Sequence, residues 1–88
     1  MKYRSRTDIV SQILEAANGG STKTRIMYKA YLSYAQLKEY LSILVANGLL
    51  EYEEAEQQYK TSQKGLRFMR TYLQISEIAG PLTTAVRE

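Results

Sequence analysis

The apolar pattern of the chain changes its period over residues 50–61, and this change limits the fold more than any other feature. Before it, apolar residues recur at the spacing of α-helices. Within it, Leu50 and Tyr52 alternate with glutamates, and residues 58–61 repeat the alternation. Such alternation is typical of half-buried β-strands. We therefore predict a hairpin with a polar tip at 54–57, placed between helices.

Three helices are expected before the hairpin. The first spans about Thr7 to Ala17, with Thr7 as its N-cap, and the second spans about Thr22 to Ala30, with Ser21 or Thr22 as its N-cap. The third follows Ser33, which forms a capping-box pattern with Gln36, and it ends before Gly48. Its expected core stripe is Tyr34, Leu37, Leu41, Leu44 and Val45, opposite a face of Ala35, Lys38, Glu39, Ser42 and Ala46. Tyr52, Tyr59 and Tyr72 are expected to join the core.

A fourth helix is expected from Thr61 or Ser62 to about Ala79, and it carries more apolar residues than one buried stripe needs. The chain has 88 residues and no cysteine, so no disulfide stabilises its small core. Two apolar rows on one helix indicate that a second chain covers one of them. We predict a homodimer through an antiparallel helix pair. The expected interface residues are Leu66, Phe68, Met69, Tyr72, Leu73, Ile75, Ile78 and Ala79.

Positive charge gathers in the first part of the chain. Residues 1–50 hold seven Lys or Arg and three acidic residues, whereas residues 51–88 hold five and six. This asymmetry indicates that the first part faces an anionic partner.

The composition excludes several classes of function. Without cysteine or histidine, the chain lacks the residues of Cys–His and Ser–His–Asp catalysis and the usual zinc ligands. Gly19-Gly20 lacks the spacing and the Lys-Ser/Thr of a phosphate-binding loop. We therefore expect no enzymatic activity, no catalytic residue, no cofactor and no metal. No apolar run approaches the roughly 18 residues that cross a bilayer, so a cytoplasmic protein without a membrane partner is expected.

The order of segments is helix, helix, helix, hairpin and long helix, with a tight connection between the second and third helices. This order defines a mainly α fold with a small β-hairpin, in which a helix-turn-helix is followed by a wing. The expected divisions are a winged helix-turn-helix with a basic arm over 1–62, a dimerisation helix over 63–79 and a flexible tail over 80–88.

Three segments of the chain resemble segments of known winged-helix proteins. Residues 59–66 (Tyr-Lys-Thr-Ser-Gln-Lys-Gly-Leu) resemble the junction between wing and last helix in many winged-helix proteins. The basic start at 4–10 and the third helix with its end, 33–50, are similar to small archaeal winged-helix DNA-binding proteins. These are chromatin-associated or resemble transcription regulators, and they dimerise through an antiparallel coiled coil of their last helices. The resemblance covers about residues 4–79.

The resemblance implies double-stranded DNA as the partner, with the third helix in the major groove and the arm or wing on the backbone. The matching positions for base contact are Ser33, Ala35, Gln36, Lys38 and Glu39, among which Gln36 could pair with adenine. The expected backbone contacts are Arg4, Arg6, Lys23, Arg25, Lys29, Tyr40, Lys60 and Lys64. A homodimer of this kind is expected to act as a transcriptional regulator or a nucleoid-associated protein.

The hairpin departs from a DNA-binding wing because it is acidic. Its glutamates are Glu51, Glu53, Glu54 and Glu56. Phosphate repels them, so the tip is expected to point away from DNA, to meet a partner such as another transcription protein, or to set a bent docking mode. The alternative function is a winged-helix protein–protein interaction module within a larger assembly, which does not bind DNA directly.

Overall fold

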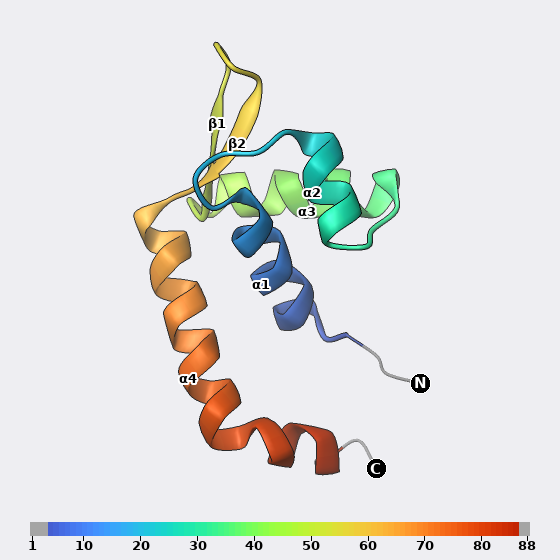
Figure 1. Cartoon of the computed structure of the whole chain (residues 1–88), viewed down its shortest axis with the longest axis vertical. Helices are drawn as coiled ribbons and strands as arrows, with labels where there is room; N and C mark the ends of the chain where they lie inside the picture. Colours follow the sequence, from blue (N-terminus) through green and yellow to red (C-terminus); the bar gives the residue numbers. More distant parts are fainter. Residues whose placement is uncertain (1–3, 87–88) are drawn as a thin grey trace.

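A computed structural model describes residues 4–86 of the chain, and it describes side chains over residues 4–75. Three helices are followed by a two-stranded hairpin and a long fourth helix (Figure 1). The elements are α1 (Arg6–Ala17), α2 (Lys23–Lys29), α3 (Tyr34–Ala46), β1 (Leu50–Glu53), β2 (Gln58–Thr61) and α4 (Gln63–Val86). The predicted mainly α fold with a winged helix-turn-helix arrangement is therefore confirmed. The dimer and the expected divisions of the chain stay predictions.

The N-cap of α1 is Ser5, and the prediction of Thr7 was wrong by two residues. The Ser5 hydroxyl accepts a hydrogen bond from the Asp8 backbone N at 3.0 Å, and the Asp8 carboxylate accepts one from Ser5 N at 3.0 Å. This reciprocal capping box uses the acidic residue three positions after the cap. Thr7 has Val10 at that position, which cannot reciprocate.

Both helices of the helix-turn-helix begin at predicted cap residues, and for α2 the cap is the second of the two candidates, Ser21 and Thr22. Thr22 caps α2, and Ser33 caps α3 in a capping box with Gln36. Between the two helices the chain reverses at Tyr31, whose φ of 55° lies in the left-handed region. Leu32 N then donates to Met27 O at 3.1 Å. The turn positions α3 across the end of α2.

The hairpin pairs β1 with β2 in antiparallel register, with Leu50 opposite Thr61 and Glu51 opposite Lys60. A third segment adds to it: Ser21 N donates to Tyr59 O at 2.9 Å, and Tyr59 N donates to Ser21 O at 2.8 Å. This bridge joins the residue before Thr22 to the wing. The start of α2 and the wing are therefore held side by side.

The core lies where α1, α2 and α3 meet the base of the hairpin. Its buried apolar residues are Ile13, Leu14, Ala17, Ile26, Ala30, Leu32, Leu37, Leu41, Leu44 and Leu50. Leu37, Leu41 and Leu44 were predicted from the helical period of α3, and all three are confirmed. Phe68 and Met69 of α4 belong to different rows of the two predicted apolar rows, and both pack against this core. The domain therefore contacts both rows, instead of leaving one whole row to a partner chain.

Three residues predicted for the core lie outside it. Tyr34 is 53% exposed, Val45 is 39% exposed and Tyr52 is 47% exposed. Tyr34 is the first residue of α3, and Tyr52 lies on the outer half of β1. Val45 lies beside Leu44 on the helix surface, about 100° further round. Tyr59, in contrast, is half-buried and packs on the core.

The junction between the wing and α4 is tied to α1 and to the connection between α3 and β1. The Thr61 hydroxyl donates to Leu14 O at 2.6 Å within the buried interior. Ser62 N donates to Leu49 O at 3.1 Å, and the Ser62 hydroxyl accepts from Gly65 N at 3.0 Å. Gly65 lies so close to the backbone of Leu49 that a Cβ would meet its carbonyl oxygen. These contacts account for the polar and glycine residues of the junction.

Helix α4 runs beside α1 and then beyond it, away from the wing (Figure 1). It continues to Val86, past Gly80-Pro81, where an end near Ala79 was predicted. The ribbon of Figure 1 bends in this last part of the helix. A proline within a helix removes one backbone hydrogen bond and bends the helix without always ending it. The side chains of Ile78 and Ala79, expected at a dimer interface, lie outside the described residues.

Candidate nucleic-acid interface

Helix α3 presents one whole face to solvent. The exposed residues of this face are Tyr34, Ala35, Lys38, Ser42, Val45 and Ala46. Lys38 lies at its centre, because residues four or seven positions apart share one face of a helix. Tyr34 precedes Lys38 by four positions, whereas Ser42 and Val45 follow it by four and by seven. Ala35, Ser42 and Ala46 have small side chains, so the helix is slim along this face. The face can approach another surface closely.

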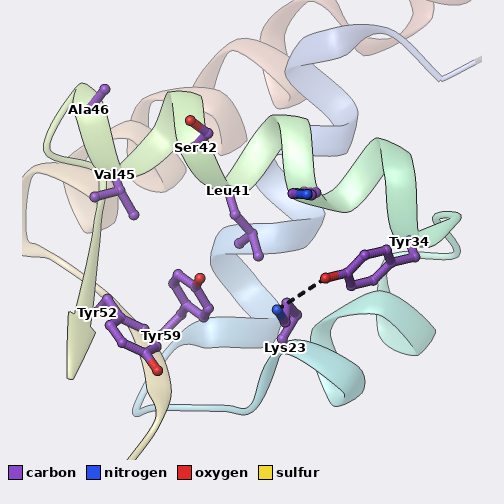
Figure 2. A pocket seen from close by; sticks show the side chains of 9 residues that line it. Lys23, Tyr34, Leu41, Ser42, Val45, Ala46, Tyr52 and Tyr59 are labelled. Carbon is purple, nitrogen blue, oxygen red and sulfur yellow. Dashed lines mark hydrogen bonds between the residues drawn. The ribbon is translucent and has the colours of Figure 1, made fainter. Parts of the chain in front are cut away.

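A groove runs between this face of α3, the start of α2 and the wing (Figure 2). Its volume is about 480 Å³. The lining residues are Lys23, Tyr34, Lys38, Leu41, Ser42, Val45, Ala46, Tyr52 and Tyr59. Lys23 comes from α2, and the two wing tyrosines come from β1 and β2. The bridge between Ser21 and Tyr59 explains why these three elements meet here.

Two tyrosine rings form the wing side of the groove. Tyr52 and Tyr59 are register partners in the hairpin, with ring centroids 4.8 Å apart and planes tilted by 50°. Figure 2 shows both rings on the wing side of the groove, opposite Leu41 of α3. Offset and tilted contacts of this kind stabilise aromatic pairs. Tyr59 is half-buried beneath, whereas Tyr52 remains open to solvent.

Lys23 and Tyr34 join α2 to α3 at the other end of the groove. Lys23 Nζ donates to the Tyr34 hydroxyl at 3.4 Å, and it lies 5.3 Å from the centre of the ring (Figure 2). Since Nζ is much nearer the hydroxyl than the ring centre, the ammonium lies beyond the oxygen instead of over the ring. The contact is a long hydrogen bond, and it leaves the ring face uncovered by the cation.

The residues predicted for base contact divide between two sides of α3. Lys38 lines the groove, whereas Gln36 and Glu39 line a second hollow with Arg6, Tyr40 and Ile43. Ser33 and Ala35 are exposed near the start of the helix. Ala35 and Lys38 therefore belong to the face of α3 beside the groove, whereas Gln36 and Glu39 belong to the side that carries the second hollow.

The Gln36 side chain already has a structural partner. Its Oε1 accepts a hydrogen bond from Ser33 N at 3.1 Å in the capping box. Pairing with adenine in the bidentate manner needs the amide oxygen as an acceptor and the amide nitrogen as a donor. The cap and the base would therefore compete for the same oxygen.

Arg4, expected on a basic arm, is held by the domain instead. Its guanidinium donates to the carbonyl oxygens of Ala30 and Tyr31, the latter at 2.8 Å, and to the side chain of Gln12. The two carbonyl groups belong to the turn between α2 and α3. Arg4 thus fastens the start of the chain to the turn that positions α3. Arg6, in contrast, is exposed beside the second hollow.

The other predicted backbone contacts lie in separate places. Lys64 Nζ donates to Asn47 O at 2.8 Å, which satisfies a carbonyl group at the end of α3. Lys29 lines a hollow with Gln12 and Glu15, away from the groove. Arg25, four residues before Lys29, occupies the same outer side of α2. Lys60 is exposed on the wing, and Tyr40 is half-buried against the core.

The wing carries its acidic residues on exposed positions. Glu51, Glu53, Glu54 and Glu56 are all exposed. The positive charge of Lys60, which lies opposite Glu51 in the hairpin, offsets the negative charge of that glutamate. Glu56 also lines a small hollow with Lys23, Tyr52 and Tyr59 next to the groove. The wing therefore carries a net negative charge, whereas the two lysines of the groove come from α2 and α3.

Sequence reasoning missed the groove because it assigned Tyr34 and Tyr52 to the core. A helical projection centred on Lys38 contains the missing signal. Tyr34 and Val45 lie within about 40° of Lys38, whereas Leu37 and Leu44 lie at least about 100° away. No sequence pattern indicated that Tyr52 would face α3, because that depends on the pairing of Ser21 with Tyr59.

Within residues 4–75, whose side chains the structure describes, no three Asp or Glu side chains gather as a metal site. Within the same part of the chain, no helix combines the length and the apolar character that crossing a membrane requires.

These features define the class of the protein, and comparison with known proteins agrees. The model of the winged helix-turn-helix family matches residues 3–80, and the chain belongs to that family. It is similar to an uncharacterised protein of Methanocaldococcus jannaschii, at 26% identity over 76 residues, which cover 85% of this chain and 76% of that protein.

The fold also resembles a solved structure. Sso10a-2, a DNA-binding protein from Sulfolobus solfataricus, superimposes with a TM-score of 0.82 at 24% sequence identity. The match covers 96% of this chain and 90% of Sso10a-2. The two chains therefore share the fold over nearly their whole length, including α4.

Proposed function

We propose that this protein binds double-stranded DNA, with α3 in the major groove. The observation that carries the proposal is the exposed face of α3, which has Lys38 at its centre and Lys23 of α2 beside it. The major groove admits one α-helix, and small side chains allow the close approach that base-edge contact requires. Ala35, Ser42 and Ala46 supply them. The name of Sso10a-2 as a DNA-binding protein supports the proposal.

Phosphate contacts would come from the exposed cations that lie on either side of α3. Lys23 and Lys38 lie along the groove, and Arg6 lies on the other side of α3. These three positive charges on both sides of one helix suit the two phosphate backbones that border a major groove. Arg25, Lys29 and Lys60 stay proposed contacts at the margin of the surface.

The proposed assembly is a homodimer through α4. Leu73 is 58% exposed and Ile75 is 57% exposed, on a helix of 24 residues that extends beyond the domain. Such side chains favour burial against a second copy of the helix. Two copies would carry two α3 helices, and the dimer would set the spacing between two half-sites.

We propose that this dimer acts at the nucleoid as a transcriptional regulator or an architectural protein. A formal charge of +3 per chain, with an acidic wing, supports regulation over dense coating of DNA. The acidic tip would point away from phosphate, and it is available to other transcription proteins.

Anisotropy of a fluorescein-labelled 20-base-pair duplex tests the proposal with two matched variants. Lys38→Gln should weaken binding about tenfold, because it removes the charge at the centre of the α3 face. Arg70→Gln removes one charge from the exposed side of α4 and should change binding by less than a factor of two. Equal effects of the two variants would overturn the placement of α3. Absence of duplex binding would favour the protein–protein interaction module.

A further inference from the structure

The groove between α3 and the wing has a lining that duplex DNA does not explain. Its walls include three tyrosines, and among the nine described lining residues none is acidic. A duplex offers a protein the edges of its bases, whereas the flat faces stay stacked inside. A lining of aromatic rings suits a planar group that presents its face.

Two of these rings are open to such a group. Tyr34 is 53% exposed and Tyr52 is 47% exposed, on opposite ends of the groove. The ammonium of Lys23 lies beyond the hydroxyl of Tyr34, so it does not cover the ring. On the wing, Tyr59 supports Tyr52 from below at a centroid distance of 4.8 Å. The groove thus holds two exposed rings in fixed positions.

The charges of the groove select the kind of planar group. Lys23 and Lys38 line it, and both are exposed. Binding sites for single strands combine positive charge along the backbone with aromatic rings that stack on bases. A neutral apolar peptide would gain nothing from the two lysines, and an acidic peptide would gain nothing from the ring faces. The combination favours a nucleotide.

We propose that this groove binds an unpaired nucleobase of a single-stranded segment, stacked on Tyr34 or Tyr52, with its phosphates near Lys23 and Lys38. This site deepens the proposed function, because the protein could then hold a melted or flipped base beside the duplex that α3 contacts. The inference rests on the proposed binding of nucleic acid by the same surface. In addition, it predicts that the protein binds single strands.

The experiment uses the full chain and fluorescein-labelled oligonucleotides of twenty nucleotides. Anisotropy is measured with oligodeoxythymidylate, with oligouridylate and with a duplex, for the original protein and for three variants. Tyr34→Leu and Tyr52→Leu keep an apolar side chain and remove the stacking ring. Tyr28→Leu is the matched control, because Tyr28 is 69% exposed on α2 and does not line the groove. Thermal unfolding by circular dichroism verifies that all variants fold.

We expect Tyr52→Leu, on the wing, to weaken single-strand binding roughly tenfold, with duplex binding changed less than twofold. Tyr34→Leu should weaken single-strand binding by the same factor, and duplex binding is compared only for Tyr52→Leu, because Tyr34 belongs to the α3 face that is proposed to contact the duplex. Tyr28→Leu should change neither single-strand nor duplex binding. The tighter of the two oligonucleotides then identifies DNA or RNA as the source of the base. Duplex binding without single-strand binding would overturn this inference and leave the proposed function intact. Equal effects of all three variants on single-strand binding would also overturn this inference. Absence of binding by the original protein to the duplex and to both single strands would overturn the proposed function itself.

Discussion

The hydroxyl of Tyr72 donates a hydrogen bond to Oδ1 of Asp8, and this contact joins α4 to the first turn of α1. Asp8 Oδ2 accepts from Ser5 N in the capping box at the same time. One carboxylate therefore stabilises the start of α1 and the position of the long helix. The hydrogen bond to Asp8, followed by burial and by the negative charge of Asp8, raises the pKa of Tyr72 above its ordinary value of 10.0.

Tyr72→Phe should lower the free energy of unfolding by about 1 kcal/mol, because it removes a hydrogen bond to a charged group that is only partly buried. The raised pKa means that the folded state keeps the phenol proton at a pH where the unfolded state loses it. The stabilisation is complete below about pH 10 and declines as the pH rises through the pKa of the folded state. Urea titrations between pH 8 and about pH 11 measure both effects.

Tyr28→Phe serves as the control for this prediction, since Tyr28 is 69% exposed and has the same hydroxyl. It should change stability by less than about 0.5 kcal/mol at every pH. Identical alkaline losses in the original protein and in Tyr72→Phe would contradict the role of the bond to Asp8.

Gly65→Ala should destabilise the fold by about 2 kcal/mol, because the new Cβ would fall against Leu49 O and 2.7 Å from Thr61 Cγ2. Neither group can move without disturbing the end of α3 or the end of the wing. Gly19→Ala is the comparison, since a Cβ there meets no atom within 4 Å. Its cost of about 1 kcal/mol comes only from the φ of +86°. Thermal melts that rank Gly19→Ala as the more damaging change would refute this account.

Part of the architecture could be predicted because it depends on local pattern. The caps at Thr22 and Ser33 and the core residues Leu37, Leu41 and Leu44 follow from side-chain type and helical period. Each is decided within a few residues of the chain.

The rest depends on contacts between distant segments. Arg4 reaches a carbonyl group 26 residues away, and Ser21 pairs with Tyr59. No local spacing indicates either contact. The exposed rings of Tyr34 and Tyr52 were assigned to the core for two different reasons. The closeness of Tyr34 to Lys38 on the helical projection was overlooked, and the position of Tyr52 depends on the pairing of Ser21 with Tyr59.

Arg4→Ala and Arg6→Ala should differ in kind, although both remove one charge from the start of the chain. Arg4→Ala should lower stability by about 1–2 kcal/mol, since its guanidinium bonds to Ala30 O and Tyr31 O at the turn. Arg6→Ala should leave stability unchanged and reduce by about 1 the slope of log affinity for duplex against log salt. Urea titration and anisotropy at several salt concentrations separate the two. Equal stability losses would contradict this assignment.

Two substitutions at Gln36 separate its cap from its proposed contact with a base. Gln36→Glu keeps the acceptor for Ser33 N and should retain stability, while it weakens duplex binding by adding a negative charge. Gln36→Ala removes both functions, so it should cost about 0.5–1 kcal/mol and alter sequence preference. Selection from a random duplex library measures the preference. Equal weakening on all sequences by Gln36→Ala would rule out base reading by this residue.

Leu73→Lys should weaken the proposed dimer at least tenfold, because it places a charge on an apolar side chain that is 58% exposed in the single chain. Gln74→Lys adds the same charge one residue further along α4 at an exposed polar position and should have little effect. Sedimentation equilibrium gives both association constants. A monomeric original protein, or equal behaviour of the two variants, would exclude α4 as the dimer interface near Leu73.

The central claim is that the exposed face of α3 binds double-stranded DNA. The most direct measurement is the anisotropy of a labelled random-sequence duplex, titrated with the original protein at about 50 and 200 mM salt. The account predicts binding that weakens steeply with salt, with a slope that gives the number of phosphate contacts. Absence of binding at the lower salt concentration would contradict it.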